Sequence, residues 1–138
     1  MDITRPLHSQ DIQSFLLWMP NWIGDVVLTL PVIQSLRRAY PVARIFVVAK
    51  FPSDELLLGP PAIDTVLTLP SGPENGFWQR VGFSRSLKKY NFDVGAVFPN
   101  SFGSAFLLSL TGAKCRLGYN TDAREIFLTH IVSTTPSL

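Results

Sequence analysis

Residues 16–27 read LLWMPNWIGDVV, and this stretch decides the fold. It begins with an apolar run that stops at Pro20, as a buried strand does, and continues through a short turn at Gly24. From residue 25 onward apolar residues recur at helical spacing, so a helix is expected over residues 25–40. In α/β sheets, ligands bind beyond the carboxyl ends of the strands, where such strand-to-helix turns lie. Asp25 stands in that position.

The rest of the chain repeats the alternation of strand and helix. Four more apolar, β-branched runs predict strands over residues 44–49, 63–69, 93–98 and 114–119. Helical patterns between them cover residues 53–58, 83–90 and 105–110. Phe77 and Trp78 share no apolar stripe with the helix predicted at 83–90, so we assign them to a loop or an extra turn. About five strands alternating with helices predict a Rossmann-like, doubly wound α/β fold with a mainly parallel sheet.

Length and composition indicate one globular domain. The chain has 138 residues, of which 46% are hydrophobic and 16% charged, and its net charge is +2. These values exclude a disordered chain and give no argument for nucleic-acid binding. No apolar run reaches the roughly 18 residues that a membrane span needs, and a single cysteine suits a reducing cytoplasm. We assign residues 1–13 to a flexible leader, 14–132 to the domain and 133–138 to a polar tail.

Several common functional motifs are missing from the sequence. There is no G-x-x-x-x-G-K-[ST] phosphate loop, no G-x-G-x-x-G dinucleotide fingerprint and no G-x-S-x-G nucleophile turn. The chain has no C-x-x-C, and its two histidines, His8 and His130, are isolated in the sequence. We therefore expect neither a metal site nor a bound cofactor.

Two polar turns remain, at residues 21–25 and 100–104, each directly after a predicted strand. The doubly wound topology makes these two strands neighbours, so we expect the turns to form one cleft. Asp25 has two roles open to it there: it caps the helix through the amides of Val27 or Leu28, or it acts as a general base toward a substrate hydroxyl. Asn100 and Ser101 carry the same ambiguity, and capping is favoured on local grounds.

The neighbours of Asp25 are interpreted from their residue types. A tight turn favours a residue without Cβ, which explains Gly24. Trp18 belongs to the strand and is expected in the core. Trp22 follows in the loop, where an aromatic ring either shields a cleft or stacks on a ligand.

Cationic residues outside these turns suggest two further contacts. Arg85, Lys88 and Lys89 are expected on the outer face of a helix, where they are either simply solvated or meet anionic lipid or a phosphorylated acceptor. Arg116 and Arg124 are expected near the cleft end of the sheet. There, arginine suits bidentate binding of a carboxylate or phosphate, although nearby acidic residues offer salt bridges instead.

Three blocks of sequence resemble one known family. Residues 20–31 (PNWIGDVVLTLP) are similar to the opening motif of the lipopolysaccharide heptosyltransferases, glycosyltransferase family 9, and most resemble its heptosyltransferase II form. A second block runs from FD at 92–93 to PNSFGSA at 99–105, and a third is RLGY at 116–119 followed by Arg124. The blocks occur in the family's order and cover roughly residues 15–132.

The resemblance implies a fold and a reaction. That family has a GT-B fold of two Rossmann-like domains facing a cleft, and this chain resembles the N-terminal, acceptor-side domain. The implied reaction moves heptose from ADP-L-glycero-D-manno-heptose to the lipopolysaccharide inner core, Kdo-lipid A or its heptosylated form, with inversion. Asp25 then corresponds to the base that deprotonates the acceptor hydroxyl. The implied acceptor-binding residues are Asn21, Trp22, Gly24, Asn100, Ser101, Arg116 and Arg124.

Family members are more than twice as long as this chain, and their donor site lies mostly in the second domain. We therefore expect the C-terminal donor-binding domain to be absent, apolar surface to be exposed, and the chain alone to be inactive. The expected location is the cytoplasm, with peripheral contact to the inner membrane through Arg85, Lys88 and Lys89. Two alternatives stay open: a stand-alone, non-catalytic α/β ligand-binding module in which Asp25 only caps a helix, and a complete flavodoxin-like nucleotide binder.

Overall fold

The computed structural model describes residues 12–99, 101–119 and 127–132. The strands are β1 (Ser14–Trp18), β2 (Arg44–Ala49), β3 (Thr65–Thr68), β4 (Val94–Val97), β5 (Cys115–Tyr119) and β6 (His130–Val132). The helices are α1 (Ile23–Ala39), α2 (Ser53–Leu56), α3 (Phe77–Ser86) and α4 (Phe102–Leu110), and a 3₁₀ turn, η2 (Leu87–Tyr90), follows α3 directly. The described residues do not include two of the predicted site residues, Asn100 and Arg124. They also leave out most of the leader and the tail.

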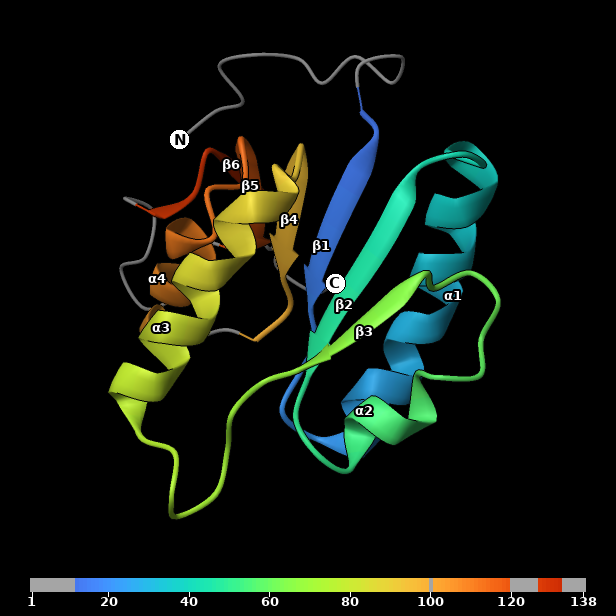
Figure 1. Cartoon of the computed structure of the whole chain (residues 1–138). Coiled ribbons are helices and arrows are strands. Elements are labelled where there is room, and N and C mark those ends of the chain that lie inside the picture. Colours follow the sequence, from blue (N-terminus) through green and yellow to red (C-terminus); the bar gives the residue numbers. More distant parts are fainter. Residues whose placement is uncertain (1–11, 100, 120–126, 133–138) are drawn as a thin grey trace, which may run out of the picture.

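The described strands form one parallel sheet between two layers of helices (Figure 1). Their order is β3-β2-β1-β4-β5-β6, so the chain winds outward from β1 in both directions and reverses between β1 and β4. This is the doubly wound order, and it confirms the predicted Rossmann-like α/β class. The sixth strand, at residues 130–132, adds one to the five expected.

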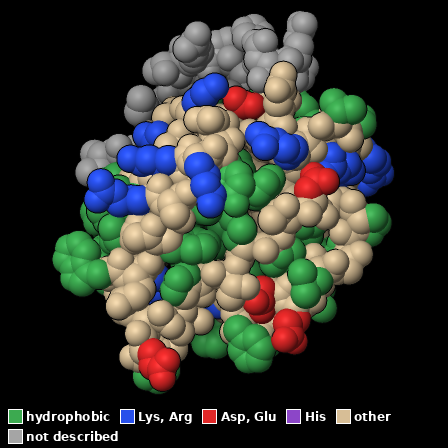
Figure 2. Space-filling model, in the orientation of Figure 1, with side chains coloured by type: hydrophobic (Ala, Val, Ile, Leu, Met, Phe, Trp, Pro, Cys, Tyr) green, Lys and Arg blue, Asp and Glu red, His purple; other side chains and the backbone are tan. Residues whose placement is uncertain are grey.

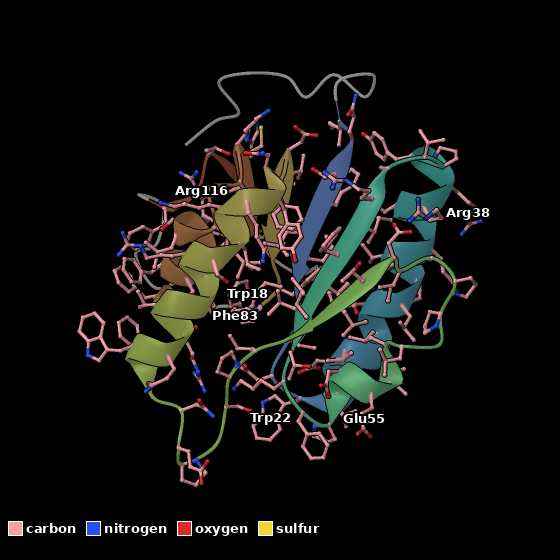
Figure 3. All side chains as sticks on the ribbon, viewed as in Figure 1. Trp18, Trp22, Arg38, Glu55, Phe83 and Arg116 are labelled. Carbon is pink, nitrogen blue, oxygen red and sulfur yellow. The ribbon has the colours of Figure 1, made fainter. Side chains whose placement is uncertain are left out.

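The two faces of β1 are buried in separate apolar layers, because successive side chains of a strand point to opposite sides. Leu16 and Trp18 face the layer that contains α4, where the Trp18 ring packs edge-on against Phe83 at 6.4 Å between centroids (Figure 3). Phe15 and Leu17 face the layer that contains α1, including Val26. Trp18 is therefore a core residue, as predicted, and β1 is the central strand of the domain.

The start of α3 differs from the sequence interpretation. Phe77 and Trp78 form its first turn, so their assignment to a loop is wrong and the extra turn belongs to one continuous helix. The ring of Phe77 stacks on Phe106 of α4 at 6.0 Å, whereas Trp78 is 77% exposed. One of these two neighbouring aromatic side chains packs on another helix and the other faces solvent. The start of α3 therefore lacks the single apolar stripe by which sequence periodicity detects a helix.

Arg37 fastens the end of α1 to the segment that enters β3. Its Nη1 donates to the carbonyl oxygen of Ala43 at 2.6 Å, and its Nε and Nη2 donate to the carbonyl oxygen of Ala62 at 3.2 and 3.0 Å. Nη2 also forms an ion pair with Asp64 Oδ2 at 2.5 Å. The same carboxylate oxygen accepts a bond from the amide of Ile45 at 2.8 Å, so one guanidinium joins α1, β2 and the approach to β3.

Gly95 lets α4 lie close to the sheet. A Cβ atom at this position of β4 would stand 2.9 Å from Leu108 Cδ1 and 3.1 Å from Ala113 Cβ. Both neighbours are buried, so they have little room to move away. The bare backbone of Gly95 therefore sets the distance between β4 and the helix that begins at the second polar turn.

Candidate active site

Asp25 lies in the first turn of α1, beyond the carboxyl end of β1. The helix begins at Ile23 and its N-cap is Trp22, which makes no side-chain capping bond. Asp25 is exposed, and among the described residues its carboxylate has no hydrogen-bond or ion-pair partner. The interpretation of Asp25 as a cap on the amides of Val27 or Leu28 is therefore wrong, because those amides lie deeper in the helix.

The residues beside Asp25 are also open to solvent. Trp22 is 75% exposed, and Figure 3 shows it at the end of the domain where β1 runs into α1. Asn21 is exposed too. Gly24 lies inside the first turn of the helix, and a Cβ atom there would meet nothing within 4 Å. The explanation of Gly24 by a tight turn is thus wrong.

The second polar turn is closed by its own serines. Ser101 is the N-cap of α4, and its Oγ accepts a bond from the amide of Ser104 at 3.2 Å, which confirms the capping role favoured from the sequence. The buried Ser104 donates from its Oγ to the carbonyl oxygen of Ser101 at 2.9 Å. These bonds fix the backbone at the start of α4 and still leave Ser101 exposed.

The two polar turns are neighbours at the carboxyl ends of the strands, which we call the carboxyl edge of the sheet. β1 pairs with β4 in parallel register, Trp18 opposite Val97, and the amide of Phe98 donates to the carbonyl oxygen of Trp18 at 3.0 Å. Pro20 and Pro99 each follow two residues after the paired positions. The strands preceding the two turns are therefore adjacent, as predicted, and both turns lie at the topological switch point, where α/β sheets bind ligands.

Lys50 and Arg80 share this edge, and sequence interpretation missed both. Lys50 directly follows β2. Arg80 extends from α3 toward Pro70, which follows β3, and its Nε donates to the Pro70 carbonyl oxygen at 3.0 Å. Burial, and secondarily the nearby charge of Arg80, lowers the pKa of the Lys50 amine. No motif marks these residues, since only the folded sheet brings the ends of β2 and β3 together.

Arg116 lies elsewhere. It is the second residue of β5 and pairs with Gly95, so it belongs to the amino-terminal half of the strand, and Figure 3 shows it at the opposite end of the domain from Trp22. Its guanidinium donates to the carbonyl oxygens of Phe127 at 2.6 Å and Ala113 at 3.0 Å. Burial lowers the pKa of this guanidinium. The expectation that Arg116 lies at the cleft end of the sheet is wrong; it organises the chain around β5.

Large apolar side chains are exposed around the carboxyl edge, as expected from the sequence. Trp22 and Ile23 begin α1, Phe51 follows β2, and Phe102 begins α4; each is at least 45% exposed. Among the residues the structure describes, no helix is long and apolar enough to cross a membrane.

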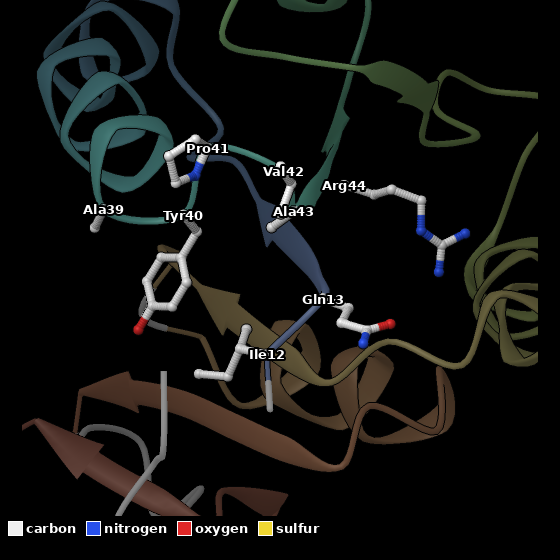
Figure 4. A pocket seen from close by; sticks show the side chains of 8 residues that line it. All are labelled: Ile12, Gln13, Ala39, Tyr40, Pro41, Val42, Ala43 and Arg44. Carbon is white, nitrogen blue, oxygen red and sulfur yellow. The ribbon is translucent and has the colours of Figure 1, made fainter. Parts of the chain in front are cut away.

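A pocket of about 640 Å³ lies at the other end of the sheet, between the start of β1 and the turn that leads into β2 (Figure 4). Its lining includes Gln13, Tyr40 and Arg44 but no carboxylate. Within the described part of the chain, no three His, Cys, Asp or Glu side chains gather as a metal site would require. The lining of this pocket therefore offers no carboxylate that could act as a general base.

Comparison with known proteins identifies related sequences. The sequence model of glycosyltransferase family 9 (heptosyltransferase) matches residues 80–135. Lipooligosaccharide heptosyltransferase 2 of Haemophilus ducreyi is 32% identical over 111 residues, 79% of this chain and 31% of that protein. Lipopolysaccharide heptosyltransferase 2 of Escherichia coli is 31% identical over 108 residues, 76% of this chain and 30% of that protein.

A solved structure has the same fold. The E. coli ADP-heptose lps heptosyltransferase II superposes with a TM-score of 0.77 at 26% identity, over 91% of this chain and 35% of that one. The chain thus spans about a third of the length of the relatives it matches. With the Rossmann-like sheet and the two turns at its switch point, these matches show that the chain belongs to glycosyltransferase family 9, the heptosyltransferase family.

Proposed function

We propose that this chain is the acceptor-side part of an inverting heptosyltransferase and that Asp25 is its general base. The donor is ADP-L-glycero-D-manno-heptose and the acceptor is the lipopolysaccharide inner core. The observation that carries the proposal is the Asp25 carboxylate, which is exposed at the switch point and has no partner among the described residues. A carboxylate already used to cap a helix or to hold a salt bridge would be less free to take a proton.

The proposed reaction has one step. The Asp25 carboxylate takes the proton of an acceptor hydroxyl as that oxygen attacks the anomeric carbon of the donor. A new carbon–oxygen bond forms on one face of the sugar, while the bond to the diphosphate breaks on the other and ADP leaves with the electron pair. The base must come within about 3 Å of the hydroxyl, and the exposed position of Asp25 permits that approach.

Exposed residues beside Asp25 are proposed to hold the acceptor. Trp22 offers an indole face for a sugar ring, and Asn21 and Ser101 offer polar groups at the two turns. Asn100 and Arg124 keep this role as proposals from the family motifs. We assign donor binding to the two thirds of the relatives' length that this chain does not span, and accordingly expect no transfer by this chain alone.

The test is transfer of heptose with the missing part supplied, either in trans or by fusing this chain to the rest of the E. coli relative. Asp25→Ala should lower kcat by a factor of about 10² to 10⁴, the usual contribution of a positioned general base. Glu55→Gln is the matched control. Glu55 is an exposed acid on α2 at the same end of the domain (Figure 3). Its variant should stay within about twofold of the wild type.

The alternative function, a stand-alone, non-catalytic ligand-binding module, predicts another result. Asp25→Ala and the wild type would then transfer equally, or no complementation would restore transfer. In that case the base assignment fails, and the exposure of Asp25 has no catalytic meaning. Tight binding of ADP or FMN by this chain alone would favour the nucleotide-binder alternative.

We also propose that the protein works in the cytoplasm at the inner membrane, with α3 and η2 facing the lipid. Arg85, Lys88 and Lys89 are exposed, and Figure 2 shows Lys and Arg side chains gathered over the face that α3 covers. Trp78, also exposed, begins the same helix and lies seven residues before Arg85, on the same side of the helix. Cations and tryptophan both favour the headgroup region of an anionic membrane.

Vesicle sedimentation tests this contact. Arg85→Gln should weaken binding to vesicles that contain phosphatidylglycerol by about fivefold, since a cation near such a surface is worth about 1 kcal/mol. Trp78→Ala should weaken binding as well, since tryptophan favours the headgroup region. Arg38→Gln is the control, because Arg38 is an exposed arginine on α1, across the sheet (Figure 3). Equal effects of the two arginine variants would show that only net charge matters and would remove the proposed orientation.

A further inference from the structure

Lys50 and Arg80 place two cations next to each other at the carboxyl edge. The amide of Leu69 donates to the carbonyl oxygen of Ala49 at 2.9 Å, so the residues that follow them, Pro70 and Lys50, also lie side by side. Arg80 reaches the same point, because its Nε donates to the Pro70 carbonyl oxygen at 3.0 Å. Two chain segments and one helix thus bring an ammonium and a guanidinium together.

The structure provides no carboxylate for this pair. Neither cation forms an ion pair with any residue in the described part of the chain, where the ion pairs are Arg37 with Asp64 and Lys114 with Asp93. Asp54, four residues after Lys50, is used locally. Its Oδ2 accepts from Thr68 Oγ1 at 2.6 Å and its Oδ1 accepts from the amide of Glu55 at 3.0 Å.

The pair is electrostatically unsatisfied. Partial burial removes water from the Lys50 amine, the positive charge of Arg80 adds repulsion, and both effects lower the pKa of Lys50. The bond to Pro70 uses only Nε of Arg80, and its two terminal nitrogens have no partner among the described residues. A guanidinium with free terminal nitrogens beside an ammonium has the donor geometry that oxyanions accept.

We propose that Lys50 and Arg80 bind an oxyanion, a phosphate or carboxylate group carried by the acceptor, next to the Asp25 turn. This inference rests on the proposed transferase function and names the anchor that orients the acceptor there. Neighbouring strands lie about 4.8 Å apart, so the ends of β2 and β3 stand within about 10 Å of the end of β1. A single acceptor molecule spans that distance, with its anionic group on the pair and its hydroxyl near Asp25.

Binding can be measured without any transfer reaction. The chain has four lysines, so ¹³C-lysine labelling gives four resolvable ε-methylene signals, and their pH titration reports each amine separately. We expect the pKa of the Lys50 amine to lie below the ordinary lysine value in the free protein. Inorganic phosphate at low ionic strength should raise the pKa of Lys50 alone, because a bound anion stabilises the charged amine.

Variants locate the site. Lys50→Gln removes one charge without breaking any hydrogen bond of the described structure, and it should weaken phosphate binding about tenfold, as should Arg80→Gln. Arg80→Gln should also raise the pKa of Lys50 in the free protein, which identifies the neighbour. Arg38→Gln is the control for net charge, because Arg38 is exposed on α1 and has no partner among the described residues, and it should change phosphate affinity less than twofold. Lys50→Arg should retain binding.

A second titration with an acidic sugar in place of phosphate distinguishes a carboxylate from a phosphate as the recognised group. The inference is overturned if neither anion raises the pKa of Lys50, or if Arg38→Gln weakens binding as much as Lys50→Gln does. Its failure is separable from failure of the proposed function. If the anions do not bind but transfer still requires Asp25, only the anion-binding role of Lys50 and Arg80 is refuted. If Asp25→Ala transfers heptose as well as the wild type, only the role of Asp25 as base is refuted.

Discussion

Replacing Arg37 with alanine should destabilise the chain by about 3 kcal/mol. The guanidinium satisfies the carbonyl oxygens of Ala43 and Ala62, two residues that are almost completely buried. Leaving a buried carbonyl without a partner costs about 1–3 kcal/mol, so two of them cost about 2–4 kcal/mol after allowance for non-additivity. The ion pair with Asp64 adds less than about 1 kcal/mol, because the Asp64 side chain is 46% exposed.

The assay is equilibrium unfolding in urea followed by circular dichroism. A loss of about 3 kcal/mol should lower the midpoint concentration with an unchanged slope, and in a thermal scan it should lower Tm by about 10 °C for a chain of this size. Arg38→Ala is the control. Arg38 is the next residue, is exposed and has no partner among the described residues, so its loss should cost less than about 0.5 kcal/mol.

Arg37→Lys tests whether geometry or charge matters. A lysine ammonium is one point charge and cannot reach Ala43 and Ala62 together, so it should recover less than half of the lost stability. The reasoning is refuted if Arg37→Ala unfolds within about 0.5 kcal/mol of the wild type. It is refuted equally if lysine restores full stability, since that would reduce the interaction to simple charge.

Three further predictions test packing and electrostatics. Gly95→Ala should cost about 1–3 kcal/mol in urea unfolding, because its Cβ would press on Leu108 and Ala113, whereas Gly103→Ala, with open space around it, should be neutral or stabilising. Ser84→Ala should raise stability by about 0.5–1 kcal/mol, since the buried Ser84 hydroxyl has no hydrogen-bond partner among the described residues; a loss of stability would show that this hydroxyl is satisfied by water. Lys50 has a lowered pKa in the folded state, so its charged form opposes folding below that pKa, and the penalty disappears as the pH approaches the ordinary value of 10.5. Lys50→Gln should therefore be stabilising at pH 7 and neutral at pH 10.5, and the opposite trend in Tm would contradict the assignment.

The sequence was sufficient for the elements that are locally encoded. β2 has the predicted bounds, and α1 begins two residues earlier and ends one residue earlier than predicted. These elements are predictable because an unbroken apolar run and a helical stripe each need no distant contact. α3 was truncated in the prediction, since Phe77 packs on another helix and Trp78 faces solvent. Neither residue continues the apolar stripe of residues 83–90, so periodicity alone does not show that the helix begins at Phe77.

The candidate site was predicted in part. The position of Asp25 follows from strand and helix periodicity, whereas its freedom from capping depends on where the first helical hydrogen bond forms, from Val26 to Trp22. Arg116 was misplaced because the register of β5 against β4 sets which end of the strand it occupies. Lys50 and Arg80 stand 30 residues apart and meet only across two strand ends, so no local pattern could pair them.

The central position of β1 has a consequence for how the chain acquires its site. Its partner on one side, β2, follows within one helix, but its partner on the other, β4, begins some 80 residues later, and Gln13 and Ser14 bond to Asp93 only then. During synthesis the turn after β1 therefore emerges before β4, one of the two strands that flank β1. Closing the long loop between β1 and β4 is slow. The geometry of the proposed site is therefore completed late in folding, when β4 pairs with β1.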